Sequence, residues 1–118
     1  MLSTNLTHLE TKEQFHQTVQ SNENVMVCCG RMGPMCIPVY GIMEEIQGEY
    51  PHVAFRDMEF DSADAHVIRS LPECREFRGL PFTVYFRHGK VVKATSSIQT
   101  KEQVTGILDA QCAPKATA

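Results

Sequence analysis

The chemistry of this sequence centres on one cysteine, Cys36, within the stretch 30–38. The apolar run 24–29 before this stretch is typical of a buried strand, and the run 42–50 after it is typical of an amphipathic helix. The stretch is therefore expected to form a tight strand-to-helix turn that places the thiol at a helix N-terminus. There the thiol faces unpaired N–H groups and the positive end of the helix dipole, which both favour the thiolate. This placement predicts sulfur chemistry.

The chain contains five cysteines, and none of them forms a Cys-x-x-Cys pair. This spacing fits neither the disulfide framework of a secreted protein nor a zinc ribbon, so reduced intracellular thiols are expected. The first ten residues lack the basic and apolar regions of a signal peptide, which favours a cytoplasmic location. The cysteines are Cys28, Cys29, Cys36, Cys74 and Cys112.

Length and composition exclude several classes of function. A chain of 118 residues with 42% hydrophobic content is expected to form one globular domain with a core of its own. A net charge of −3 without a basic cluster argues against a nucleic-acid-binding surface, and no apolar run approaches the length of a membrane span. We therefore expect a monomer that binds neither nucleic acid nor membrane and carries no cofactor.

The predicted elements alternate along most of the chain. Two capping boxes, which start at Thr11 and Thr100, begin the first and the last helix. Within the second helix, Pro38 and Gly41 predict a kink. An alternating order that ends in a hairpin predicts an α/β domain with a mixed sheet and helices on both faces. The expected helices are 11–21, the segment up to about 50, a segment capped by 61–64 and one from 100 onward. The expected strands are a short edge strand near 6–9, then 25–29, 52–60, 80–86 and 91–95. Residues 1–112 are expected to form the domain and residues 113–118 a disordered tail.

Three segments resemble thioredoxin, and the resemblance extends from about Leu6 to Asp109. The segments are the helix 42–50, the strand 80–86 with the turn after it, and the helix start at 100–104. The resemblance implies a thioredoxin fold, in which a central mixed sheet is flanked by helices on both faces. It also implies a cis peptide bond before Pro81, which in this family forms one wall of a peptide-binding groove opposite the active-site turn. The groove residues implied here are Met32, Gly33, Pro34, Met35, Leu80 and Pro81.

The active-site motif of the family, Trp-Cys-Gly-Pro-Cys, is degenerate in this sequence, and two registers are open. Without a gap, Met32-Gly33-Pro34-Met35-Cys36 overlies the motif. In this preferred register Gly33 replaces the first, attacking cysteine, and Cys36 keeps the second. Matching Gly33-Pro34 to the Gly-Pro of the motif instead places Met32 and Met35 at the two cysteine positions. In either register the dithiol pair is absent.

Other positions also depart from the family. Val27 stands where the family has a buried Asp on the central strand, and Asp57 stands where it has the paired Lys. Ser97 replaces a Gly that flanks the groove, and the segment 61–81 is longer by several residues. Ordinary disulfide reduction is therefore not expected.

Cys36 itself has two interpretations. It is either a reactive single thiol that forms mixed disulfides or a half-buried remnant of a lost pair. Cys29 is a possible second thiol, because it overlies an aromatic position near the active site of the family, although disulfide geometry is demanding. Met32, Met35 and Cys36 together offer soft ligands that would suit Cu(I), but no His or second thiol stands at a ligand spacing. A methionine rim around an apolar groove is the simpler interpretation, and no metal is expected.

Two functions follow from different classes of protein. The first is a monothiol redox protein, related to thiol-disulfide oxidoreductases, that acts through Cys36 on a protein or peptide thiol client. The alternative is a non-catalytic binding module that grips an extended peptide or partner protein between Pro81 and the turn 32–35. The reactivity of the thiol discriminates between the two.

Overall fold

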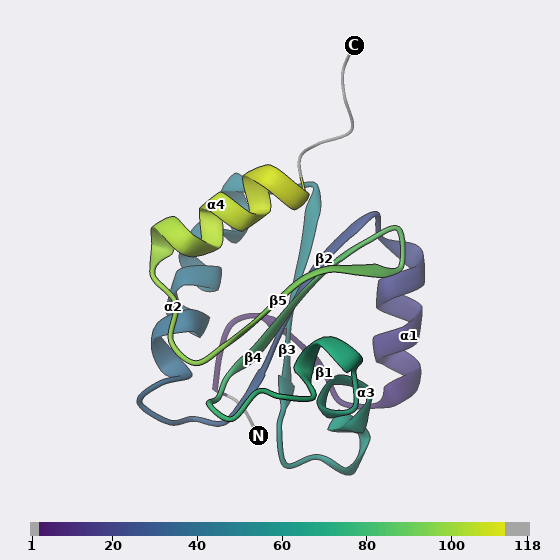
Figure 1. The fold of residues 1–118 in the computed structure, drawn as a ribbon. Coiled ribbons are helices and arrows are strands. Elements are labelled where there is room, and N and C mark those ends of the chain that lie inside the picture. The colour runs from purple at the N-terminus through teal and green to yellow at the C-terminus, as the bar shows by residue number, and fades with distance from the viewer. Residues whose placement is uncertain (1–2, 113–118) are drawn as a thin grey trace.

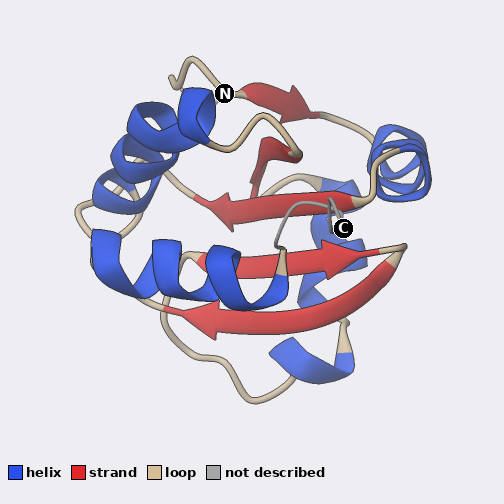
Figure 2. Ribbon diagram, turned by 90° about the horizontal axis from the view of Figure 1, so that it is seen from above, coloured by secondary structure: helices blue, strands red, loops and turns tan. Residues whose placement is uncertain are grey.

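The computed structural model describes residues 3–112, so the predicted tail 113–118 lies outside the described residues. A five-stranded sheet in the order β1-β3-β2-β4-β5 has helices on both faces (Figure 1, Figure 2). The predicted α/β class with a mixed sheet is therefore confirmed. The elements are β1 (Thr7–Leu9), α1 (Lys12–Ser21), β2 (Asn24–Gly30), α2 (Ile37–Ile46), β3 (Val53–Glu59), α3 (His66–Arg69), β4 (Phe82–Arg87), β5 (Lys90–Ser96) and α4 (Lys101–Gln111), with short 3₁₀ turns η1 (Gln47–Glu49), η2 (Ala63–Ala65) and η3 (Pro72–Cys74).

The central strand is β2. It pairs in parallel with β3 on one side and antiparallel with β4 on the other, while β1 adds in parallel to the far edge of β3. All seven residues of β2 are buried, because helices cover both faces of the sheet at this point. The chain leaves the C-terminal end of this strand directly into the turn that carries Cys36.

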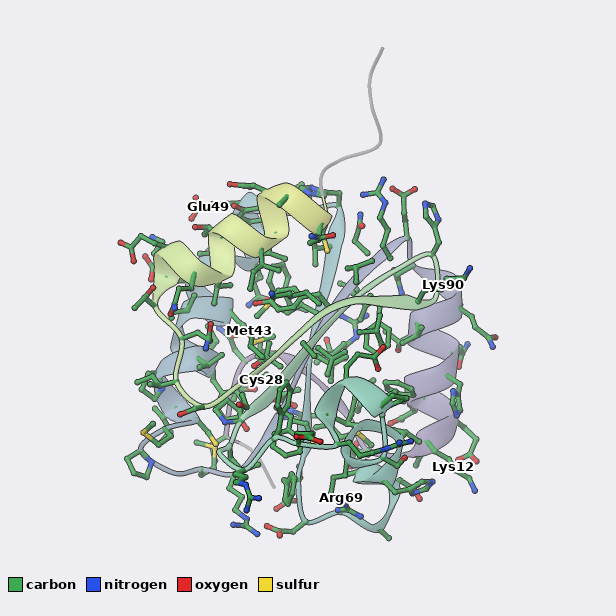
Figure 3. The ribbon with its side chains drawn as sticks, in the orientation of Figure 1. Lys12, Cys28, Met43, Glu49, Arg69 and Lys90 are labelled. Atoms are coloured by element: carbon green, nitrogen blue, oxygen red, sulfur yellow. The ribbon has the colours of Figure 1, made fainter. Side chains whose placement is uncertain are left out.

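Alternation along the strands divides the core into two layers. Met26 and Cys28 pack on the side of α2 and α4, whereas Val27 and Cys29 pack on the side of α1 and α3. Figure 1 shows the same division, with α2 and α4 on one side of the sheet and α1 and α3 on the other. Cys28 and Met43, labelled in Figure 3, belong to the first layer.

The first and last helices begin where their capping boxes predict. The Thr11 hydroxyl accepts a hydrogen bond from Gln14 N–H, and the Thr100 hydroxyl accepts one from Gln103 N–H. In each case the glutamine side chain reaches back to the backbone N–H of the threonine. Two backbone donors at each helix start are thereby satisfied within the capping box, and in α1 the N–H of Lys12 donates to the Asp64 carboxylate.

Two predicted helices differ in the structure. The third begins as the 3₁₀ turn η2, continues as the four-residue α3 and ends before η3, because Pro72 forces Leu71 into an extended conformation (ψ 138°), as a proline at this point predicts. The second runs as α2 from Ile37 to Ile46 and continues only as a 3₁₀ turn to Glu49, and the kink between Pro38 and Gly41 stays a prediction. Pro38 lies in its first turn, where a missing backbone N–H costs nothing.

Three residues in the described part of the chain have a positive φ. His88 (φ 52°) and Gly89 (φ 79°) form the two-residue turn between β4 and β5, and positive φ at both positions is the property of a type I′ hairpin turn. Ser97 (φ 68°) follows β5 at the position where the resemblance predicts Gly. A side chain in this backbone region is unfavourable, so the family's glycine is explained by geometry that this chain retains.

We expect the substitution Ser97→Gly to stabilise the protein by about 0.5 kcal/mol. The left-handed conformation costs a side-chain-bearing residue about 1–2 kcal/mol, and part of this gain is offset by the greater freedom of Gly in the unfolded chain. Denaturant unfolding would measure the change. Ser96→Gly, one residue earlier and within β5, is the matched control and should destabilise, so equal effects of the two substitutions would contradict the argument.

Candidate functional site

Cys36 lies at the start of α2 and is only 2% exposed. The turn before it is closed by the carbonyl of Gly33, which accepts hydrogen bonds from the N–H groups of Cys36 (3.1 Å) and Ile37 (3.0 Å). The thiol therefore sits at the helix N-terminus, as the sequence predicts, but beneath the turn rather than on its surface.

The predicted contact between the thiol and unpaired N–H groups of the helix is wrong. The N–H groups of Val39 and Tyr40 donate to the carbonyl of Cys36, and Pro38 has no N–H to offer. The Cys36 Sγ instead accepts from the backbone N–H of Arg31 at 3.4 Å. The donor thus comes from the residue that follows β2, not from the helix.

Three groups from distant parts of the chain converge on Gly30, the last residue of β2. A methyl group at Gly30 would lie 2.7 Å from Cys36 Sγ, 2.9 Å from Tyr40 Oη and 3.0 Å from Pro81 Cβ. Real Cβ contacts are not this close, so only glycine fits this position. The Leu80–Pro81 peptide bond is cis. Cys36 and Pro81, which are far apart in the sequence, are therefore held against the same point of the sheet.

Exposed apolar side chains surround this point. Met32, Met35, Ile37 and Ile98 are between 41% and 48% exposed. Ile98 comes from the far side of the site, where the N–H of Ser97 donates to the carbonyls of Gly79 and Pro81 (both 3.1 Å). Among the other predicted groove residues, Pro34 is exposed, and Gly33 and Leu80 are partly exposed.

The guanidinium of Arg31 binds Asp61 and not the Cys36 thiol. The Arg31 guanidinium makes a bidentate pair with Asp61, with N–O distances of 2.7 and 2.8 Å, and lies 5.3 Å from the centre of the Phe60 ring. The pKa of the Asp61 carboxyl is lowered, chiefly by its hydrogen bond to Arg31. The side chain of Arg31 thus anchors the turn to the loop after β3, and only its backbone N–H reaches Cys36.

Burial disfavours the thiolate at the other four cysteines. It raises the pKa of Cys29 to about 12 and that of Cys74 to about 11, and it also raises the pKa values of Cys28 and Cys112. These four thiols therefore keep their protons near neutral pH and are poor nucleophiles.

The cysteines are divided between the two layers of the core. Cys29 packs with Cys74 on the side of α1 and α3, whereas Cys28 shares the layer of Cys36. The Thr83 hydroxyl donates to Cys28 Sγ at 3.8 Å. A Cys29–Cys36 disulfide stays a prediction, which the placement of the two residues in different layers does not favour.

Within residues 3–112, no three His, Cys, Asp or Glu side chains come together in an arrangement that could hold a metal ion. No helix in the same part of the chain is long and apolar enough to cross a membrane.

Asp57, which stands where the resemblance places the paired Lys of the family, is a buried carboxylate whose partners were not predicted. Its side chain is fully buried, accepts a hydrogen bond from the Thr4 hydroxyl and lies 2.6 Å from His8 Nδ1. The partners come from β1 and the segment before it, since His8 pairs with Asp57 across the two strands. The burial of Asp57 could be predicted from the sequence, because Val53, Phe55 and Asp57 are alternate residues of β3 and therefore share one face of the sheet.

We expect Gly30→Ala to destabilise the protein by about 1–3 kcal/mol, the range for overpacking a filled core. The added methyl would displace Cys36 Sγ, Tyr40 Oη or Pro81. Denaturant unfolding would measure the loss. Gly33→Ala is the matched control in the same turn, because a methyl there meets nothing within 4 Å, and a loss equal to that of Gly30→Ala would refute the packing argument.

Asp57 should give the stability a measurable pH dependence. Burial raises its pKa, against the opposing effect of the hydrogen bonds from Thr4 and His8, so the folded state binds this proton more tightly than the unfolded state. The free energy contributed by protonated Asp57 is therefore fully present below the unfolded value of about 3.9 and is lost as pH rises through the raised pKa.

Chemical denaturation of the wild type and of Asp57→Asn across this pH range would test the point. The difference in unfolding free energy between the wild type and the variant should shrink as pH rises. Glu13→Gln, an exposed residue of α1, controls for the loss of one carboxylate. A constant difference would contradict the assignment.

No family model and no curated protein matches the sequence. Solved thioredoxin structures match the fold. Thioredoxin of Plasmodium falciparum is 16% identical, with 90% of this chain and 99% of that chain covered and a TM-score of 0.73. Mitochondrial thioredoxin 3 of Saccharomyces cerevisiae in its oxidised form is 19% identical, with 88% and 94% covered and a TM-score of 0.72. Thioredoxin f2 of Chlamydomonas reinhardtii is 16% identical, with 94% and 100% covered and a TM-score of 0.73. This chain has the thioredoxin fold.

Proposed function

We propose that this protein is a thioredoxin-fold redox protein that acts through a single thiol, Cys36, by forming a mixed disulfide with a protein or peptide client. The convergence at Gly30 carries the proposal. It brings Cys36 Sγ and Pro81 Cβ to one point, beneath a rim on which Met32 and Met35 are exposed. An extended client segment laid across this rim presents its sulfur to Cys36.

The reaction is a thiol–disulfide exchange. The Cys36 thiolate attacks one sulfur of a client disulfide, a new S–S bond forms, and the other client sulfur leaves as a thiolate with the electron pair of the broken bond. No second thiol is paired with Cys36 in the turn, so the adduct persists until a soluble low-molecular-mass thiol attacks it. The absence of a paired thiol suits a reducing compartment such as the cytoplasm, and a monomer suffices for the reaction.

Burial of Cys36 sets the condition for this chemistry. Because the side chain is only 2% exposed, the turn 31–36 must move for a client sulfur to reach it. The turn rests on the two hydrogen bonds to the Gly33 carbonyl and on the exposed ion pair of Arg31 with Asp61. Exposed ion pairs contribute little stability, so a modest interaction with a client can compensate for the opening.

The exposed rim favours a second candidate, a binding module without chemistry. Met32, Met35, Ile37 and Ile98 lie on both sides of the site, and flexible methionine side chains adapt to varied partners. In this case Cys36 is only a buried core residue. Its small size and its contact with Gly30 would then explain its presence.

Incubation of the folded protein with oxidised glutathione, followed by mass spectrometry, would separate the two candidates. We expect one glutathione adduct, on Cys36, and none on the other four cysteines. Cys36→Ser should abolish the adduct, and the same treatment in guanidinium should label all the cysteines. We also expect no turnover in reduction of insulin disulfides, because one thiol cannot complete intramolecular release. A folded protein without an adduct on Cys36 would leave the binding module as the function.

A further inference from the structure

The hydroxyl of Tyr40 lacks a partner in the core. Tyr40 lies in the first turns of α2 and is 2% exposed. Its Oη is buried and makes no hydrogen bond within the part of the chain that the structure describes. Native proteins rarely leave a buried hydroxyl unpaired, and each exception needs a reason. A phenylalanine would fill the same space without that cost, so the hydroxyl itself requires an explanation.

The position of this hydroxyl points to Cys36. A methyl group at Gly30 would lie 2.9 Å from Tyr40 Oη and 2.7 Å from Cys36 Sγ, so the two atoms are no further apart than the sum of these distances. Burial, together with the nearby Cys28, Cys36 and Asp57, raises the pKa of Tyr40 far above its ordinary value. The phenol therefore keeps its proton near neutral pH, and it can donate that hydrogen to an anion.

We propose that the Tyr40 hydroxyl is the hydrogen-bond donor that stabilises the Cys36 thiolate; this inference rests on the proposed single-thiol function and adds a residue to it. With the neutral thiol the hydroxyl makes no hydrogen bond. A thiolate is a stronger acceptor, because hydrogen bonds to ionised groups are roughly twice as strong as neutral ones. The bond therefore forms when the sulfur becomes charged and the Oη and Sγ atoms approach to hydrogen-bond distance, a contact that they do not make in the structure.

The step that benefits is release of the client. A soluble thiolate, such as that of glutathione, attacks the client sulfur of the Cys36 mixed disulfide. The new S–S bond joins the soluble thiol to the client sulfur, the Cys36–client S–S bond breaks, and Cys36 Sγ takes its electron pair as the leaving thiolate. Tyr40 O–H donates to this sulfur without transferring its proton. The backbone N–H of Arg31 is the second donor to the same atom.

Other groups near Cys36 are committed elsewhere. The Arg31 guanidinium is paired with Asp61, and Thr83 donates to Cys28 rather than to Cys36. Cys28 and Asp57 face the same layer as possible sources of negative charge, and both oppose an anion at Cys36. Of the two partnerless tyrosine hydroxyls in this layer, that of Tyr40 approaches the same point at Gly30 as Cys36 Sγ, so Tyr40 is the side-chain donor that we assign to the thiolate.

The test compares Tyr40→Phe with Tyr85→Phe. Tyr85 is the matched control, because it is a fully buried tyrosine of the same layer whose hydroxyl also has no partner in the described residues. Each substitution removes one oxygen and keeps the ring.

The Cys36–glutathione adduct of each protein is treated with reduced glutathione, and the release of the free protein thiol is followed by mass spectrometry. We expect release from Tyr40→Phe to be about tenfold slower than from the wild type, from the loss of one charge-assisted hydrogen bond, and release from Tyr85→Phe to be unchanged. Equal release rates for the wild type and Tyr40→Phe would overturn the proposal.

A second measurement needs no client. The ultraviolet absorbance of the Cys36 thiolate is titrated in the wild type, Tyr40→Phe and Tyr85→Phe, each with its Cys36→Ser version subtracted. We expect the thiolate of Tyr40→Phe to appear about one pH unit higher than in the other two proteins, which corresponds to a tenfold smaller population at a given pH. Coincident curves, or no thiolate signal from wild-type Cys36, would overturn the inference. A protein that shows the shift but forms no glutathione adduct would instead remove the proposed function while leaving the Tyr40 contact in place.

Discussion

The site depends on the absence of a side chain at the end of the central strand. β2 is buried on both faces, so whatever lies at its last residue, Gly30, must fit between two packed layers. Because this residue has no Cβ, the start of α2 and the residue after the cis peptide bond can both approach the strand closely. The contact joins segments that are about fifty residues apart in the chain, and it fixes the turn that carries Cys36 relative to Pro81. Met32 and Met35 of the same turn stay exposed above this contact.

Much of the fold could be read from local signals. The capping boxes at Thr11 and Thr100 act within a single turn, so the sequence alone locates both helix starts. The alternation of β3 and the glycine turn after β4 are equally local. The third helix carries a local signal as well, because Pro72 predicts a break or a second short turn containing Cys74, and the structure has this turn as η3. The beginning of the same segment as the 3₁₀ turn η2 was not predicted.

The site was predicted less completely than the fold. Cys36 and Pro81 could be named because each stands in a recognisable local pattern. The hydrogen-bond donor to the thiol could not, since it is the backbone N–H of Arg31, and every residue but proline carries such a group. Tyr40 was not predicted as a site residue for another reason. A tyrosine on an apolar helix face predicts only that its ring is buried in the core, whereas the surroundings of its hydroxyl depend on the strand that packs opposite. Cys28 and Cys29 are adjacent in the sequence, and successive residues of a strand point to opposite faces of the sheet. Only Cys28 therefore shares the layer of Cys36.

The distribution of charge around the thiol departs from what a dithiol enzyme of this fold requires. Val27, at the position where the resemblance places a buried acid, packs on the side of α1 and α3, while the buried acid of this chain, Asp57, is bound to Thr4 and His8 of the N-terminal segment. A carboxylate held in this way serves to attach β1 to β3 and is not available to move protons at Cys36.

Dithiol chemistry needs a base that repeatedly takes and returns the proton of the second sulfur, whereas a single thiol needs only stabilisation of its anion when a disulfide bond breaks. Neutral donors that keep their protons, a backbone N–H and a buried phenol, are sufficient for that task. Under the proposed single-thiol function, the absence of a paired cysteine and of an acid bound near Cys36 would both suit a site that holds a charge rather than one that exchanges protons.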